Sequence, residues 1–209
     1  MSEIIEQSIQ DFLDELASKS ATPGGGSAAA IMGSVSAALT SMMCHLTLSK
    51  TNYVGVESDM QMLLQKSETL RVQFTEMIQA DVEAFDGVMT AYGLSNQTEA
   101  EKIFRAQAIQ EALIIATEVP LVCARLSAKA IDLSKEAAEK GNINVITDAG
   151  VAVMAAYAAL KSVALNVHVN VAAIKDKAYT DLKLAELSQI EKIAELETEQ
   201  TYNFIKSKL

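Results

Sequence analysis

Asp81 interrupts a stripe of apolar residues whose spacing of three and four positions predicts one face of a helix. The apolar members of this stripe, which are expected to be buried, are Phe74, Met77, Ile78, Phe85, Val88 and Tyr92. A carboxylate on such a face must be paired, be hydrogen-bonded or have a raised pKa. Asp81 is therefore a candidate general acid or base, or a counter-charge for a cationic substrate. The structural alternative is a buried acid bound to a backbone or basic partner.

Asp148 begins a second unusual stripe, on a helix expected over about 145–174. At helical spacing it is followed by alanines and then by Ser162, Asn166 and Asn170, so a polar line runs along a helix that otherwise looks buried. Asp148 alone could simply match the dipole at the helix start. That role does not explain the three polar residues that follow, so we expect the stripe to face a polar group or ligand.

A turn before the second expected helix holds one of the two prolines and three of the nine glycines, in the order Pro23, Gly24, Gly25, Gly26 and then Ser27. Three glycines leave the backbone without Cβ atoms, so another group can approach it closely. Ser27 is predicted to cap the helix that follows, whose free N–H groups suit an anionic or polar ligand. The alternative is a tight turn between two packed helices. The run is neither a P-loop nor a dinucleotide-binding turn, because no Gly-Lys-Ser/Thr follows it and no strand pattern precedes it.

The other residues that could carry chemistry are isolated in the sequence. His45 and His168 lack the spacing to cysteines or carboxylates that a zinc site requires, so no metal is expected. No Ser/His/Asp arrangement can be recognised. Lys50 follows an uncharged helix, where it either holds an anionic substrate tail or merely favours the helix C-terminus.

The elements that must position these residues are all helical, since no segment shows the alternation of a strand. Helices are predicted over about 3–18, 27–49, 57–92, 145–174 and 177–208, with a loop at 49–55. Thr98 and Glu101 form a capping-box pattern at a further helix start, and Pro120 is expected to start or kink another helix that ends near Lys140. The predicted fold is an all-α, single-domain bundle of residues 1–209, with two central helices rich in small residues.

The composition limits the class of protein. Half of the 209 residues are apolar, which is enough for the core of one domain. A net charge of −10 and a pI near 4.7 argue against nucleic acid as a partner. Cys44 and Cys123 are expected to be reduced core residues. The acidic, amphipathic start at residues 1–6 is unlike a signal peptide, so a cytoplasmic location is expected.

Two uncharged stretches are long enough to cross a membrane, which takes roughly 20 apolar residues. Residues 20–49 contain no formal charge, and Lys161 is the one formal charge within 149–174. Both stretches are rich in Ala, Ser, Thr, Gly or Asn rather than in Leu, Ile and Phe. They are therefore predicted to be buried central helices, and no membrane partner is expected.

Four blocks together resemble the formiminotransferase-cyclodeaminase family, in its cyclodeaminase part. They are Ala-Thr-Pro-Gly-Gly-Gly-Ser at 21–27, Asp-Val-Glu-Ala-Phe-Asp at 81–86, Val-Pro-Leu at 119–121 and Gly-Asn-Ile-Asn-Val-Ile-Thr-Asp-Ala-Gly-Val at 141–151. Around 81–94 and 152–170 the chain is similar to the free-standing bacterial members that hydrolyse methenyltetrahydrofolate. It departs from the family at Ala21, where many relatives have a second proline, and at 49–53, which is less basic than usual.

This resemblance implies an all-helical homodimer that binds a folate substrate and uses no metal or redox cofactor. The implied reaction is hydrolysis of the cyclic methenyltetrahydrofolate cation to formyltetrahydrofolate. Asp81 and Asp148 would stabilise the cation, orient the water and take its proton, and the sequence does not divide these roles between them. The expected substrate contacts are Pro23, Gly24, Gly25, Gly26, Ser27, Lys50, Tyr53, Asn144 and Asn166. Lys50 would lie near the glutamate carboxylates of the folate.

Two other functions are compatible with the same residues. One is the sister reaction of the family, formiminotetrahydrofolate cyclodeaminase, which closes the same ring and releases ammonia. The other is a non-catalytic folate-binding or assembly protein, which would be indifferent to Asp81→Asn. The sequence leaves open the preference for polyglutamate, the direction of flux and whether each site is shared between subunits.

Overall fold

The computed structural model describes residues 4–209, and within them it contains helices and turns but no strand. The α-helices are α1 (Ile9–Leu16), α2 (Gly25–Thr47), α3 (Glu57–Gly93), α4 (Glu99–Lys140), α5 (Ile146–Val171) and α6 (Lys177–Lys206). Short 3-10 turns are η1 (Ile4–Glu6), η2 (Thr51–Val56) and η3 (Ile143–Val145). The predicted all-α class is confirmed. Residue 3, at which the first helix was predicted to begin, and the two residues before it lie outside the described part.

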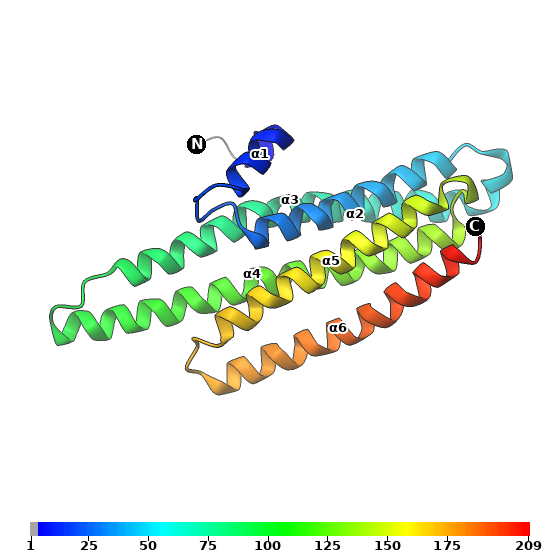
Figure 1. Ribbon diagram of the computed structural model, residues 1–209. Helices are drawn as coiled ribbons and strands as arrows, with labels where there is room; N and C mark the ends of the chain where they lie inside the picture. The colour runs from blue at the N-terminus through cyan, green and yellow to red at the C-terminus, as the bar shows by residue number, and fades with distance from the viewer. Residues whose placement is uncertain (1–3) are drawn as a thin grey trace.

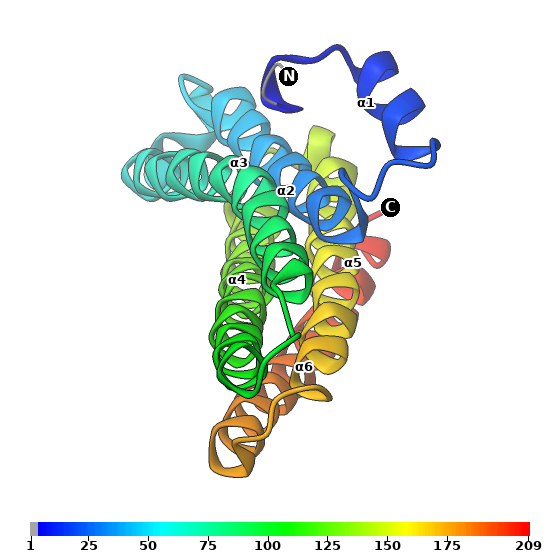
Figure 2. The ribbon, with the colours of Figure 1, turned by 90° about the vertical axis from the view of Figure 1, so that its left-hand side faces the viewer.

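The five long helices run back and forth along one axis, and the short α1 lies beside the start of α2 (Figure 1). α2 packs against α3 and α5, while α5 packs against α4, α2 and α6. Viewed along the bundle, α2 and α5 lie side by side, with α3 and α4 to their left and α6 at the bottom (Figure 2). The two uncharged stretches are therefore neighbouring helices of one bundle, and each has many buried alanines.

Small residues allow α2 and α3 to approach closely. Gly33 of α2 lies against the ring of Phe74 on α3, where a Cβ would overlap the ring atoms. Phe74 is fully buried, together with Leu121 of α4 and Leu160 of α5. The helix rich in small residues thus lets large side chains of its neighbours fill the core.

The ends of α4 follow the sequence prediction, but its interior does not. The Thr98 hydroxyl accepts a hydrogen bond from the Glu101 N–H at 3.2 Å, and the Glu101 carboxylate accepts one from the Thr98 N–H at 2.8 Å, so the capping box is confirmed. Pro120 was predicted to start or kink a further helix; it does not start one, because α4 continues through it to Lys140.

A side chain from α5 compensates for the proline. Because Pro120 has no N–H, the carbonyl oxygen of Ala116 lacks its usual donor within the helix. The amide of Asn170 on α5 donates to that oxygen at 2.6 Å. One polar residue of the α5 stripe therefore satisfies a backbone group on its neighbour, which removes the main penalty for a proline inside a helix.

The structure differs from the predicted helix bounds in two places, the start of the chain and the segment that follows α2. The first predicted helix is a 3-10 turn followed by α1, which Ser8 caps by accepting from the Asp11 N–H at 3.1 Å. α2 ends at Thr47, and Ser49 just beyond it has a positive φ of 63°. The predicted loop at 49–55 is largely the 3-10 turn η2.

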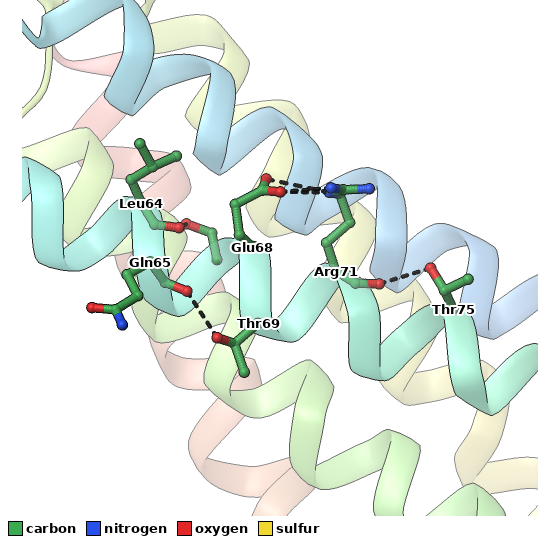
Figure 3. Close-up of polar contacts among 7 residues, drawn as sticks. Leu64, Gln65, Glu68, Thr69, Arg71 and Thr75 are labelled. Atoms are coloured by element: carbon green, nitrogen blue, oxygen red, sulfur yellow. Dashed lines mark hydrogen bonds and ion pairs between the residues drawn. The ribbon is translucent and has the colours of Figure 1, made fainter.

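The exposed face of α3 carries local contacts that support a long helix. Arg71 pairs with Glu68 at 2.6 Å, and the hydroxyls of Thr69 and Thr75 donate to carbonyls one turn earlier at 2.9 and 2.8 Å (Figure 3). All of these partners lie on α3 itself. The ion pair adds a small stabilisation of the helix, and the two hydroxyls satisfy their hydrogen bonds locally.

Two helical spans, Gly25–Thr47 and Ile143–Val171, pass the length and composition test for crossing a membrane. Roughly half of the apolar window in each is buried inside the bundle, at 56% and 44% respectively. The rest of each window is at least partly exposed, so both helices combine a packed face with an outer face of few charges, on which Lys161 of α5 is exposed and pairs with Glu191.

Candidate active site

A cavity of about 450 Å³ lies where the start of α2 meets α3, α4 and the end of α5. Its lining is mostly apolar and comes from all four helices and the turn before α2. The residues are Ala21, Thr22, Gly24, Gly25, Gly26, Asp81, Ala84, Phe85, Val88, Tyr92, Leu113, Ala116, Val119, Pro120, Asn166, Val169, Asn170 and Ala173. Asp81 is the one formally charged member of this lining.

Asp81 faces the first turn of α2. The Ser27 hydroxyl donates to one carboxylate oxygen of Asp81 at 2.9 Å. Burial raises the pKa of Asp81, while hydrogen bonds from the hydroxyl and the backbone of Ser27 partly offset that rise. No basic side chain is among the causes of this shift. The pKa of Asp81 is therefore set by burial and by hydrogen bonds from Ser27. A raised pKa is one of the possibilities that the sequence allowed for an acid on this face.

The prediction that Ser27 caps α2 is wrong. The capping residue is Gly24, whose backbone is extended and offers no side-chain bond. Ser27 lies one turn inside the helix, where its hydroxyl is used by Asp81 instead. Gly24 supplies no side-chain cap, and the Asp81 carboxylate instead accepts a hydrogen bond from the backbone N–H of Ser27 in the first turn of α2. The positive dipole end of the helix points toward the cavity.

Gly26 is the glycine of the run that the site requires. A Cβ on Gly26 would overlap the carboxylate of Asp81, whereas one on Gly25 would meet nothing within 4 Å. The predicted close approach to the glycine run is thus real, and the group that makes it is the carboxylate of Asp81. Pro23 is buried below this turn, and the peptide bond between Thr22 and Pro23 is cis.

Asn166 and Asn170 line the cavity from the end of α5. The Asn170 amide is engaged with the Ala116 carbonyl. Cys123 lies beneath Asp81, and burial first, then the charge of Asp81, raises the pKa of its thiol to about 12. The thiol therefore stays protonated and is not a nucleophile, which agrees with the predicted core role of Cys123.

Two aromatic residues at the rim were expected to be buried and are not. Phe85 and Tyr92 are 38% and 43% exposed and line the cavity together with Val88. α2 begins beside Asp81, so no part of it covers α3 beyond that point. The helical stripe was read correctly, but past Asp81 it faces the cavity instead of the core. Arg105 donates to the Tyr92 carbonyl at 2.9 and 3.2 Å and lies over its ring.

The structure does not bring all predicted site residues together within one chain. Asp81, Asn166 and Gly24–Gly26 line the cavity, and Ser27 is joined to it through its hydrogen bond to Asp81. Pro23 is buried and is not part of the lining. Asp148 lies at the opposite end of α5, about 27 Å from Asn166 at about 1.5 Å per residue. Lys50 follows the far end of α2, so it too is remote from the cavity.

Hydrogen bonds at that far end join the end of α2 and the turn η2 to the turn that precedes α5. The Asn142 N–H donates to the Thr47 hydroxyl at 2.9 Å, and the Ile143 N–H donates to the Tyr53 hydroxyl at 2.9 Å. The Asn144 N–H donates to the Asn142 side chain at 3.1 Å. Tyr53 is therefore part of the structural support of this end, while the side chains of Lys50 and Asn144 are exposed and Asp148 is half-buried.

Other hollows are less suited to chemistry. The groove between α3 and α4, of about 640 Å³, is lined by Lys66, Lys129, Asp132 and Glu136 among others, which is typical of a solvated surface. Within residues 4–209 no group of three or more His, Cys, Asp or Glu side chains is arranged to hold a metal ion. The cavity at Asp81 is thus the best candidate for an active site.

The geometry suits a flat, partly apolar molecule that carries positive charge. The walls offer apolar surface and the aromatic edges of Phe85 and Tyr92, and Asp81 offers a negative charge with a raised pKa. A carboxyl group of this kind can stabilise a cation and can also exchange a proton with water. The fold and the cavity therefore define an all-helical protein with a candidate site for acid–base chemistry on a cationic ligand.

The chain belongs to the formiminotransferase-cyclodeaminase family, whose model matches residues 8–189. It is 53% identical to a protein of Methylorubrum extorquens named methenyltetrahydrofolate cyclohydrolase, over 97% of this chain and 98% of that one. It is 30% identical to the formimidoyltransferase-cyclodeaminase of Mus musculus, of which it covers 33%. The crystal structure of formiminotetrahydrofolate cyclodeaminase from Thermotoga maritima superposes with a TM-score of 0.84 at 28% identity, over 99% of this chain and 98% of that one.

Proposed function

We propose that this chain is a methenyltetrahydrofolate cyclohydrolase, which hydrolyses the cyclic methenyltetrahydrofolate cation to formyltetrahydrofolate. The observation that carries the proposal is the cavity in which Asp81 is the sole charge, because a buried carboxylate favours a cationic substrate. The relative of the same length with 53% identity supports this choice of substrate.

In the proposed reaction, water adds to the carbon that lies between two folate nitrogens and shares their positive charge. Asp81 accepts a proton from the water as the new carbon–oxygen bond forms. The bond from that carbon to one nitrogen then breaks, and Asp81 returns the proton to the departing nitrogen. The added hydroxyl loses its remaining proton to water as the formyl C=O bond forms, so the reaction releases one proton overall. Ser27 holds the carboxylate in place throughout, with its hydroxyl 2.9 Å from one oxygen. The second oxygen of Asp81 is then the one that faces the water.

We propose that the reaction needs no metal or redox cofactor. The attacked carbon is already electrophilic because of its positive charge, and no change of oxidation state takes place. The walls around Asp81 exclude bulk water and strengthen its interaction with the cation. We also propose that the protein is a cytoplasmic homodimer without nucleic-acid or membrane partners, which its net charge of −10 supports with respect to nucleic acid.

The test is the loss of methenyltetrahydrofolate absorbance on addition of purified protein, corrected for spontaneous hydrolysis. We expect catalysed turnover. Failure of well-folded protein to accelerate the loss would refute the proposal.

The second candidate is cyclodeamination, which the similarity to the Thermotoga maritima structure favours. The cavity offers the same acid–base group for closing the ring and expelling ammonia. Ammonia release from formiminotetrahydrofolate, measured beside hydrolysis of the methenyl compound, distinguishes the two. A non-catalytic folate-binding protein would show neither activity.

A further inference from the structure

We propose that Asn170 is a specificity-determining residue of the cavity, and that its side-chain oxygen accepts a hydrogen bond from the 2-amino group of a pterin ring. The inference rests on the proposed function for its substrate class. It deepens that function by assigning a residue to the end of the substrate that does not react. It also gives a purpose to the polar stripe of α5, which the mechanism above does not use.

The last two polar residues of the α5 stripe line the cavity. Asn166 and Asn170 lie one helical turn apart on the same face of α5, and both belong to the lining. Ser162, one turn earlier, donates to the Ala158 carbonyl at 2.7 Å and is thus satisfied inside its own helix. Two side-chain amides therefore lie next to each other in a lining in which Asp81 is the one charged residue.

The orientation of the Asn170 amide is fixed by the chemistry of its partner. A side-chain amide has a nitrogen that donates and an oxygen that accepts. The Ala116 carbonyl can only accept, and Pro120 has no N–H with which to satisfy it. The amide nitrogen of Asn170 must therefore be the atom that lies 2.6 Å from the Ala116 oxygen. The proline in α4 thus determines that the oxygen of Asn170 is the atom that remains for another partner.

The side-chain oxygen of Asn170 is an accessible acceptor. Among residues 4–209, the hydrogen bond to Ala116 is the one that the Asn170 side chain makes, and it occupies the nitrogen. The oxygen is not one of the buried polar atoms that lack a partner in this part of the chain, so it is open to the cavity that Asn170 lines. Asn166 is half-buried, and its amide is likewise accessible from the cavity.

The lining matches the two ends of a pterin substrate. The pyrimidine end of a pterin is neutral and presents a 2-amino group and a ring N–H, which donate, and a 4-oxo group, which accepts. The positive charge of the methenyl compound lies at the other end of the ring system. Asp81 lies on α3 and the two amides on α5, and each of these helices packs against both α2 and α4. The cavity therefore offers a carboxylate from one helix and neutral amides from another.

A neutral acceptor suits the amino group better than a second acid would. A further carboxylate in this cavity would be repelled by Asp81 and would tend to stay protonated. The Asn170 oxygen accepts without adding charge. Asn166, which has both a donor and an acceptor, can bind the neighbouring oxo and N–H groups. The pair thus distinguishes a pterin from a flat cation that lacks this edge.

The test must separate recognition from the support of α4. Asn170→Ala alone also leaves the Ala116 carbonyl without a donor, so it should lower the melting temperature by about 3 °C. In a Pro120→Ala background the restored N–H of residue 120 can satisfy that carbonyl. Asn170→Ala should then lower the melting temperature by less, while its effect on recognition remains.

The kinetic measurement compares Pro120→Ala with the double variant that also carries Asn170→Ala. The contact is made by a part of the substrate that does not react, so its loss should raise KM for methenyltetrahydrofolate about fivefold and leave kcat within about twofold. A residue that only compensated for the proline would change neither value in this background. An unchanged KM, or a lower kcat at unchanged KM, would overturn the proposal.

A binding measurement without turnover separates this inference from the proposed function. The probes are 5-formyltetrahydrofolate and its analogue in which hydrogen replaces the 2-amino group. By calorimetry, the wild-type protein should bind the amino compound about tenfold more tightly than the analogue, and Asn170→Ala should bind the two about equally. Equal affinities in the wild-type protein, or a preference that survives Asn170→Ala, would overturn the inference even if turnover is normal. The expected preference in a protein without turnover would refute the proposed function alone.

Discussion

The two ends of α2 differ in how they use their polar groups. At its start, Gly26 and Ser27 contact a carboxylate that borders a cavity. At its end, Thr47 donates to the Met43 carbonyl at 2.7 Å and accepts from the Asn142 N–H at 2.9 Å. Polar groups at the end satisfy backbone partners, whereas those at the start control the protonation of one acid. The candidate site therefore lies at the start of α2, while the end of α2 is joined to the turn before α5.

The two ends also differ in what they contribute to stability. Burial raises the pKa of Asp81, so its charged form is less favourable in the folded chain than in the unfolded chain. Ionised Asp81 therefore opposes folding at neutral pH. The hydrogen bonds at Thr47 and Asn142 involve no charged group. They satisfy the Asn142 N–H and the Asn142 side-chain amide, so they favour folding at every pH. The predictions below test this contrast, from the largest expected effect to the smallest.

Gly26→Ala should cause the largest change. Its Cβ would overlap the Asp81 carboxylate, so the carboxylate must move or α2 must shift. We expect turnover to fall about 100-fold, as for a catalytic group misplaced by ~1 Å. Gly25→Ala is the matched control, because its Cβ meets nothing within 4 Å. Equal activity of the two variants would contradict the role of the close approach.

Thr47→Val should destabilise the protein without changing the pKa of Asp81. The substitution keeps the shape of the side chain but leaves the buried Asn142 N–H without its acceptor. We expect a loss of about 1–3 kcal/mol in the free energy of unfolding, measured by urea denaturation. Thr69→Val on the exposed face of α3 is the control and should change stability little. A Thr47→Val variant as stable as wild type would argue against a firmly connected far end.

Ser27→Ala should shift the pH dependence of turnover. The Ser27 hydroxyl lowers the pKa of Asp81, so its removal should move the acidic limb to higher pH. Loss of a hydrogen bond to a charged group, at about 1.4 kcal/mol, corresponds to about one pH unit. Activity would then fall about tenfold below the limb and little above it. A pH–rate profile of kcat that does not move would show that Asp81 is not the titrating group.

Asp132→Asn should have the smallest effect. Burial first, then Glu197, raises the pKa of Asp132 to about 7, although it lies between α4 and α6 away from both ends of α2. A raised pKa means that ionisation of Asp132 reduces stability as pH rises toward 7. The variant should therefore gain less than about 0.5 kcal/mol at pH 8 and nothing at pH 4, with unchanged turnover. Reduced turnover would mean that a raised pKa outside the cavity also matters for the reaction.

Local patterns predicted the helices because the responsible interactions are local. The capping box of Thr98 and Glu101 and the stripe from Phe74 to Tyr92 each depend on residues within a few turns. The continuation of α4 through Pro120 was not predictable in this way. It depends on Asn170, which is fifty residues away in the sequence and donates to the Ala116 carbonyl.

The candidate site was predicted in part. The sequence indicated that Asp81 and the glycine run could act together, and the structure brings them to one cavity. The hydrogen bond from Ser27 to Asp81 and the exposure of Phe85 depend on where α2 begins relative to α3. The separation of Asp148 from Asp81 could have been predicted from the order and direction of the helices. Helices joined by short loops alternate in direction, so the start of α5 must lie at the end of α2 opposite Gly25.

The central claim is that Asp81 performs the acid–base step, and the most direct measurement is the rate of methenyltetrahydrofolate hydrolysis by Asp81→Asn. Asp86→Asn, an exposed acid on the same helix, serves as the control. Above the ordinary pKa of an aspartate, Asp81→Asn should melt no lower than wild type, because the charge that burial disfavours is gone.

We predict a fall in turnover on the order of 10² to 10⁴ for Asp81→Asn and little change for Asp86→Asn. A folded Asp81→Asn variant that hydrolyses the substrate as fast as wild type would contradict the account.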